Sequence, residues 1–370
     1  MTALRRWPWP FLLLLLGAAL ATARVVPAFT VSPVLVLTVF LPPLLFDAGF
    51  SMRAASVRRQ LSWILSFGFL GALLNAAIVF AVLRMAGVAF EVAALLAAIL
   101  AATDPVSVFA ALRRLRTPER LRVALQGESL VNDGVAVVLF AVVLSVAQGQ
   151  VVGTGETLGL FVWLTLGGLI VGSVIGIATR WAIARLPNLL QIGISVVAAY
   201  AGYLIADRIG VSGLLAVIAL SLVLGTAFQP PTYHLLHRFW QQLGYVMSSV
   251  VFLLVGLQVL LDQVLSTGVS LVVLVVAMLV ARTVMVFVIT APRADLWPLS
   301  WRVALVWAGL RGALSLALAL SVPVEVGGHA EILVLVFGFV FISLAFQGLS
   351  TGPVFAALGI TRQTAVETVP

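Results

Sequence analysis

The chain has 370 residues, of which 62% are hydrophobic and only 9% are charged, whereas a soluble domain carries roughly 25% charged residues. This composition excludes a soluble globular protein, and the long apolar runs differ from the ~10-residue alternating strands of a transmembrane barrel. The net charge of +8 lies in short loops instead of one basic domain, so nucleic acid is not an expected partner. The absence of cysteine excludes disulfides and cysteine-ligated metals.

Apolar segments long enough to cross ~30 Å of hydrocarbon recur from end to end. We predict twelve spans, at residues 8–23, 32–50, 61–83, 90–113, 121–147, 157–181, 189–206, 211–227, 236–260, 269–290, 300–322 and 331–352. No loop between them is long enough to form a soluble domain. The sequence therefore predicts a single all-α polytopic unit over residues 1–370 that contacts the lipid bilayer and functions within it.

The arginines orient these spans. With a cytoplasmic N-terminus, sixteen arginines fall in cytoplasmic segments and three in external segments, while Arg282 and Arg311 lie within spans. Such a bias follows the positive-inside rule and places both termini in the cytoplasm. The first segment has a basic start and ends in Ala21-Thr22-Ala23, which is also typical of a secretory signal peptide. We expect an uncleaved helix there, and cleavage would leave eleven spans in the same orientation.

The fourth span is interrupted in the stretch AATDPVSVFAAL. Pro105 lacks a backbone donor and disfavours helical geometry at Asp104. Backbone groups freed at membrane depth are tolerated where they line a cavity or are buried in protein. A carboxylate at Asp104 would offset the positive end of a half-helix beginning at Pro105, and Thr103 adds two oxygen donors suited to an alkali cation. An ordinary proline kink is the alternative interpretation.

The fifth span carries two polar stripes. Ser129 and Asp133 are four residues apart and share one face, and Glu128 and Asn132 share a neighbouring face. Carboxylates within a bilayer cost at least ~2.5 kcal/mol each and are by default functional. The first stripe is typical of a site for a dehydrated cation or a proton. The second indicates structural pairing.

The eleventh span contains Arg311 between Gly309 and Gly312 in an apolar run. A guanidinium at this depth must be paired, since it cannot lose its proton, and Glu128 is the partner that we predict. The glycines indicate an unwound helix. Interruptions in spans 4 and 11 predict inverted repeats of spans 3–5 and 10–12, whose broken helices cross near the midplane as in secondary transporters.

Five motifs occur in one order along the chain, namely LPPLLFDAGF, TDPVSV, GESLVNDG, FLLVGLQ and WAGLRGALSLALAL. Together they resemble the electroneutral cation/proton antiporters of the NhaP/NHE type. The resemblance implies sodium/proton exchange, with lithium as a further cation, in a bacterial inner (plasma) membrane and without a cofactor. It also implies a homodimer in which core helices over residues 61–147 and 269–352 move against dimerisation helices over residues 8–50 and 157–260.

The resemblance also assigns residues in the fourth and fifth spans. Asp133 matches the aspartate that binds the ion and the proton, and Thr103 and Ser129 match oxygen ligands of Na⁺. Asn132 matches the asparagine of the ND pair, which implies one-for-one, electroneutral exchange.

Three further acidic positions and one arginine match the family pattern. Asp104 matches the aspartate of the broken helix, and Glu128 with Arg311 matches a buried ion pair beside the site. Asp47 matches an accessory acidic position in the second span.

Alternatives remain open at this level. A potassium/proton antiporter of the same fold would carry the same motifs, because ligand distances decide between the cations. A cation channel would conduct current without forcing proton exchange. An intramembrane enzyme is disfavoured because GESL lacks the second glycine of a nucleophile elbow.

Overall fold

The computed structural model describes residues 9–25, 32–52, 54–104, 117–150, 153–228, 232–258, 264 and 266–360. All the regular elements within these ranges are helices. Six helical segments are long and apolar enough to cross a membrane, namely Val57–Met85, Glu119–Ala147, Thr154–Ile183, Leu190–Ile209, Gly268–Leu296 and His329–Ala357. Shorter apolar helices accompany them, and the predicted all-α polytopic fold is confirmed.

The first half of the chain supplies five predicted spans. Its helices are α1 (Trp9–Thr22), α2 (Pro33–Leu35), α3 (Leu41–Phe50), α4 (Ala54–Leu65), α5 (Gly71–Met85), α6 (Phe90–Ile99) and α8 (Glu119–Ala147). Two π-helical turns, Val36–Phe40 and Ser66–Leu70, join α2 to α3 and α4 to α5. The predicted continuation of the fourth span beyond Asp104 lies outside the described residues.

The second half supplies the other seven spans. Its helices are α9 (Thr154–Ile183), α10 (Asn188–Ile209), α11 (Gly213–Gly225), α12 (Thr232–Gly256), α14 (Gly268–Thr290), α15 (Leu299–Trp307), α16 (Ala313–Leu320), α17 (His329–Ile342) and α18 (Leu349–Ala357). A 3₁₀ turn, Ala291–Leu296, follows α14, and a π-helical turn, Ser343–Gly348, joins α17 to α18. The predicted eleventh span is two short helices, α15 and α16, as expected for a broken span.

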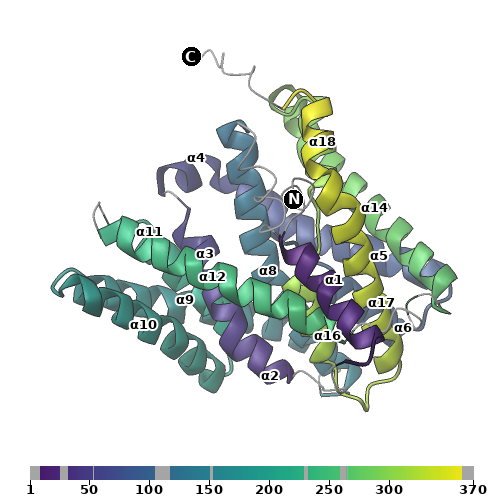
Figure 1. Ribbon diagram of the computed structural model, residues 1–370, viewed down its shortest axis with the longest axis horizontal. Coiled ribbons are helices and arrows are strands. Elements are labelled where there is room, and N and C mark those ends of the chain that lie inside the picture. The colour runs from purple at the N-terminus through teal and green to yellow at the C-terminus, as the bar shows by residue number, and fades with distance from the viewer. Residues whose placement is uncertain are drawn as a thin grey trace.

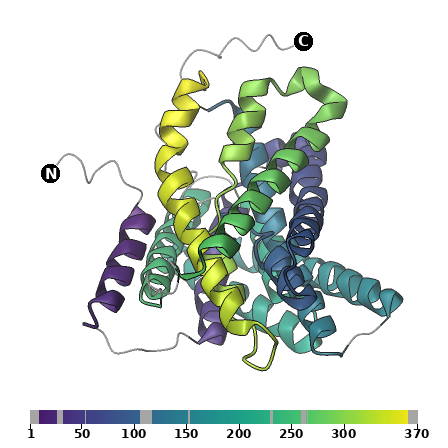
Figure 2. The same cartoon turned by 90° about the vertical axis from the view of Figure 1, so that its right-hand side faces the viewer.

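Two groups of helices pack among themselves. In the first group, α9 packs on α10 and α11, α11 on α3, and α3 on α12, which also contacts α1. In the second, α5 packs on α6 and α14, α6 on α8, and α17 on α14 and α16. Figures 1 and 2 show α9 and α10 at one end of the molecule and α14 and α18 at the other.

Close helix contact in the first group depends on small residues. A Cβ added to Gly172 of α9 would lie 2.0 Å from the carbonyl oxygen of Ala216 in α11, so the two backbones touch. Close approach of backbones through glycine is typical of helix packing in membranes. Lipid tails are as apolar as the side chains, so the hydrophobic effect does not drive helices together there, and close packing does. The opposite face of α9 exposes apolar side chains, as a lipid-facing helix does: Leu158, Val162, Leu166, Ile170, Val174 and Ile177.

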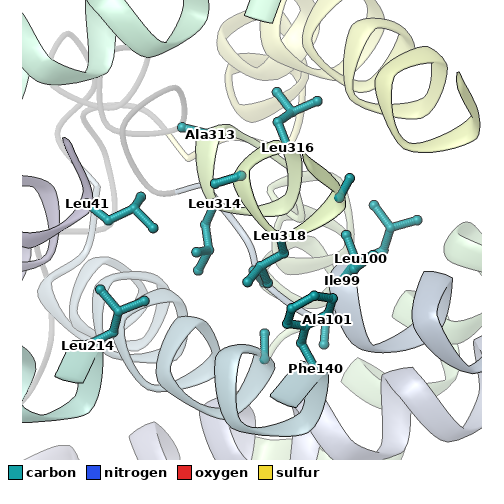
Figure 3. Packing of buried hydrophobic residues seen from close by; sticks show 14 of the residues in the cluster. Leu41, Ile99, Leu100, Ala101, Phe140, Leu214, Ala313, Leu314, Leu316 and Leu318 are labelled. Carbon is teal, nitrogen blue, oxygen red and sulfur yellow. The ribbon is translucent and has the colours of Figure 1, made fainter. Parts of the chain in front are cut away.

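The short helix α16 lies in the apolar interior of the molecule. It contacts α6 and α8 of one group and α12 of the other. Figure 3 shows Leu314, Leu316 and Leu318 of α16 among buried side chains of α3, α8 and α11, which include Leu41, Phe140 and Leu214. The predicted break in the eleventh span therefore lies deep in the protein, where its freed backbone groups need protein partners.

Candidate ion-binding site

The first break follows α6 and is held by groups from the second broken span. After Ile99 the chain leaves helical geometry, and residues 102–104 have no regular structure. The hydroxyl of Ser315 donates to the carbonyl oxygen of Ile99 at 3.0 Å, and the backbone N–H of Asp104 donates to the carbonyl oxygen of Leu310 at 2.8 Å. The predicted half-helix beginning at Pro105 lies outside the described residues.

The second break, residues 308–312, lies against the first. A Cβ added to Gly312 would be 2.5 Å from the Cβ of Asp104, so only glycine lets the two chains approach this closely. A Cβ added to Gly309 would be 2.7 Å from Nε of Arg282. The two glycines of the predicted break therefore serve close packing as well as unwinding, and the broken segments of spans 4 and 11 touch.

Two polar residues of α8 bind the first break at Thr103. The hydroxyl of Ser129 donates to the Thr103 carbonyl oxygen at 2.7 Å. The Asn132 amide donates to Oγ1 of Thr103 at 2.8 Å, and its Oδ1 accepts from the Thr103 N–H at 3.4 Å. The structure thus brings together Thr103, Ser129 and Asn132, three residues that the sequence assigned to one site. The amide of Asn132 therefore binds Thr103 through both its nitrogen and its oxygen.

Asp133 lies one residue further along α8 and is 8% exposed. Its Oδ1 is buried and has no hydrogen-bond partner among the described residues. Asp104, which is also buried, and Arg311 are near enough for Coulombic interaction with Asp133. A buried carboxylate oxygen needs a partner, and either a cation or a proton would satisfy it.

The oxygens around Asp133 have the chemistry that an alkali cation requires. Ser129 gives its proton to Thr103 and so keeps its own lone pairs available, and the Thr103 carbonyl oxygen retains a second lone pair. Carboxylate, carbonyl and hydroxyl oxygens are hard donors, which suit hard cations better than the soft metals bound by thiolates. The arrangement can therefore hold a small dehydrated cation or a proton.

The predicted ion pair between Glu128 and Arg311 is wrong. Glu128 pairs with Arg282 of α14, whose two terminal nitrogens bind the two carboxylate oxygens, NH1 on Oε1 and NH2 on Oε2. Arg282 also donates from Nε and NH2 to the Leu305 carbonyl oxygen, at 3.1 and 2.9 Å. That carbonyl lies in the last turn of α15, where the helix dipole favours a cation.

Arg311 instead binds the backbone of the first break. Its NH1 donates to the carbonyl oxygens of Ala101 and Ala102, which follow the end of α6. The side chain is only 1% exposed, so these carbonyls satisfy NH1 of a buried guanidinium, while Glu128 and Asp133 act on its charge from a distance. Each broken span thus has its freed carbonyls capped by an arginine from another segment.

Asp47 lies on α3 against α12. It accepts a hydrogen bond from Ser51 at 3.3 Å, and a Cβ on Gly244 of α12 would be 3.2 Å from its Cβ. Ser51 also lies 3.3 Å from Nδ1 of His237. The accessory role of Asp47 stays a prediction.

The chain is similar to known membrane transporters. A sequence profile described as "Sodium/hydrogen exchanger, transmembrane" matches residues 2–357. The Na(+)/H(+) antiporter ApNhaP of Aphanothece halophytica is 36% identical over 369 residues, which cover 96% of this chain and 70% of that protein. The low-affinity Na(+)/H(+) antiporter NhaS1 of Synechocystis is 34% identical, with 96% of this chain and 71% of that protein covered.

A solved structure shares the fold. The structure of the sodium proton antiporter MjNhaP1 from Methanocaldococcus jannaschii at pH 8 matches with a TM-score of 0.80 at 20% identity, covering 94% of this chain and 92% of that chain. The profile match and the relatives show that this integral, multi-pass membrane protein is a transporter and not an enzyme, and that it belongs to the sodium/hydrogen exchanger family.

Proposed function

We propose that the protein exchanges sodium, and lithium as a further cation, for protons by alternating access, with both ions competing for Asp133. The observation that carries this proposal is the unpartnered, buried Oδ1 of Asp133 beside Ser129 and Thr103. An ion bound there would contact carboxylate, hydroxyl and carbonyl oxygens at the crossing of two broken helices. The relatives named as Na(+)/H(+) antiporters support sodium as the cation. No resident cofactor is needed.

The exchange is proposed to be electroneutral. Asp133 alone would carry either a cation or a proton, so both loaded forms cross with the same charge. Glu128 is neutralised by Arg282, and Asn132 is uncharged and bound to Thr103, so neither adds a charge to the transported state. A potassium/proton antiporter of the same fold is the remaining alternative, because the same oxygens suit both cations.

The moving parts are proposed to be the two helix groups of a homodimer. Core helices within residues 61–147 and 269–352 carry both breaks and Asp133, and helices within residues 8–50 and 157–260 form the dimerisation scaffold. The packing of α9 on α10 and α11, and of α5 on α6 and α14, supports this division. The break residues bind one another and α8, so the site would move as one body.

The direct test uses the full chain in proteoliposomes with a pH-sensitive dye. Adding sodium, lithium or potassium in turn should reverse an imposed acidification only for transported cations. Clamping the membrane potential with valinomycin and potassium, in separate sodium runs, should leave the rate unchanged. Cation flux without proton movement would instead identify a channel, and a rate that follows the potential would implicate a second titrating group, first of all Asp104.

Competition at one carboxylate predicts a defined pH dependence. Because Asp133 binds a cation only when it is ionised, falling pH should weaken cation binding. Below the pKa of Asp133, the apparent cation constant should rise about tenfold per pH unit, equivalent to ~1.4 kcal/mol. Above it the constant should level off, and exchange should slow for lack of protons, which gives a bell-shaped profile. Apparent sodium affinity measured in half-unit pH steps checks this, and a flat affinity with a changing maximal rate would exclude the shared site.

A further inference from the structure

Polar side chains of the last span hold both ends of the second break. The indole Nε1 of Trp307, the last residue of α15, donates to the Ser350 hydroxyl at 2.9 Å. The backbone N–H of Arg311 donates to the Ser343 hydroxyl at 3.4 Å. Ser343 and Ser350 both belong to the last span, and each contacts the second break through its hydroxyl. The unwound residues between Trp307 and Gly312 are thus fixed at both ends by one span.

Gln347 lies between these two serines in the sequence and orients the hydroxyl of Ser343. Ser343 donates its single hydroxyl proton to Oε1 of Gln347 at 2.7 Å, in the π-helical turn Ser343–Gly348. Ser343 is 2% exposed, so its hydroxyl depends on a protein acceptor such as Gln347. With its proton directed to Gln347, the hydroxyl turns its lone pairs toward the N–H of Arg311. Without Gln347 the proton would turn to a carbonyl of its own helix one turn earlier, and the lone pairs would turn away.

The position of Arg311 is transmitted to the residues around Asp133. Its guanidinium holds the carbonyls of Ala101 and Ala102, directly before Thr103. The next residue, Gly312, packs on Asp104, and the preceding residue, Leu310, binds the N–H of Asp104. A shift of the Arg311 backbone would therefore move the Thr103 carbonyl and Asp104 together. Misplacing ligands in this way weakens binding without removing any ligand.

We propose that Gln347 is a positioning residue for the cation site, acting through Ser343 and Arg311 on the first break. The proposal rests on the proposed function of Asp133 as the cation site. It parallels the first repeat, in which Ser129 and Asn132 of α8 hold Thr103. The last span holds the second break in the same way, and Gln347 orients the hydroxyl that does so. A π-helical turn at this point fits the frequent use of such turns at functional sites.

The test compares Gln347→Leu with Gln347→Glu in the full chain, with sodium-driven proton flux in proteoliposomes as the first readout. Gln347→Leu should raise the sodium concentration for half-maximal rate up to about tenfold, the factor expected from one buried hydrogen bond, and leave the maximal rate within about twofold. Gln347→Glu keeps an acceptor oxygen for Ser343 and should restore near wild-type affinity. Phe346→Leu, at a 70% exposed position on the same turn, is the matched control and should change neither value.

The route through Ser343 is tested by a double-mutant cycle. Ser343→Ala should weaken sodium affinity as Gln347→Leu does, and the double variant should be no worse than either single one, because both remove the same link. Additive losses, or an equal fall in maximal rate with unchanged affinity in both Gln347 variants, would overturn the proposal and leave Gln347 a packing residue.

A second readout separates this proposal from the proposed function. Thermal stabilisation of the purified protein by sodium measures binding without transport. If the wild-type chain binds sodium but drives no proton flux, exchange is wrong, and a weaker sodium stabilisation in Gln347→Leu than in Phe346→Leu still supports the positioning role. Equal stabilisation in all variants would overturn it.

Discussion

Asp133→Asn is expected to reduce cation-driven proton flux to less than a few per cent of the wild-type value. The amide has nearly the same size as the carboxylate but can neither release a proton nor balance a cation. Because Oδ1 of Asp133 has no hydrogen-bond partner among the described residues, the change should remove no described hydrogen bond at that atom. The variant should therefore insert and purify like the wild type, and sodium should no longer stabilise it thermally.

The matched control is Asp207→Asn, which neutralises an exposed carboxylate near the end of α10. It should leave flux and sodium stabilisation unchanged, because surface charges contribute little to a buried site. Residual flux well above a few per cent in Asp133→Asn would move the proton- and cation-binding role to another carboxylate. Asp104, which lies within Coulombic range of Asp133, would then be the first residue to test.

The breaks could be predicted from sequence because single residues dictate them. Pro105 and the glycines at 309 and 312 each perturb helical geometry locally, and the structure has irregular backbone directly before the first and around the other two. The helix ends followed from apolar length, so the span predicted at 121–147 is α8, Glu119–Ala147. The same reasoning could not predict the π-helical turn Ser343–Gly348, since no residue type specifies such a turn.

The grouping of the site residues also followed from helical periodicity. Ser129 and Asp133 share a face of α8 whatever the tertiary structure, and the family pattern placed Thr103 opposite them. The partner of Arg311 could not be obtained in this way, because the sequence shows charged side chains but not the carbonyls that a break exposes. Ala101 and Ala102 carry no polar side chain, yet their carbonyls bind the guanidinium.

The role of Arg282 was missed for a related reason. Arg282 is one of two arginines within the predicted spans, and only Arg311 was assigned a partner. An arginine in an apolar span without a nearby acidic residue was itself a signal that a distant carboxylate must serve it. With two buried arginines and four carboxylates in the spans, the sequence left the pairing undetermined.

Arg282→Ala is expected to be among the most destabilising single changes in the protein. It would leave Glu128, which is 1% exposed, as an unpaired buried charge, at a typical cost of ~3–5 kcal/mol. It would also remove both donors from the Leu305 carbonyl oxygen at the end of α15. Arg282→Lys should recover only part of this loss, because an ammonium cannot form the bidentate pair. The measurement is the unfolding temperature in detergent at one fixed scan rate, since membrane proteins commonly unfold irreversibly.

A double change identifies the true partner of Glu128. Arg282→Ala with Glu128→Gln should be more stable than Arg282→Ala alone, because the neutral amide removes the stranded charge. Arg311→Ala provides the matched comparison, because its guanidinium binds Ala101 and Ala102 and not Glu128. Combining Arg311→Ala with Glu128→Gln should therefore give clearly less recovery than the Arg282 pair, because Glu128 acts on Arg311 only at a distance. Recovery with Arg311→Ala but not with Arg282→Ala would restore the pairing that the sequence suggested. It would also mean that α14 and the second break are arranged differently in the membrane.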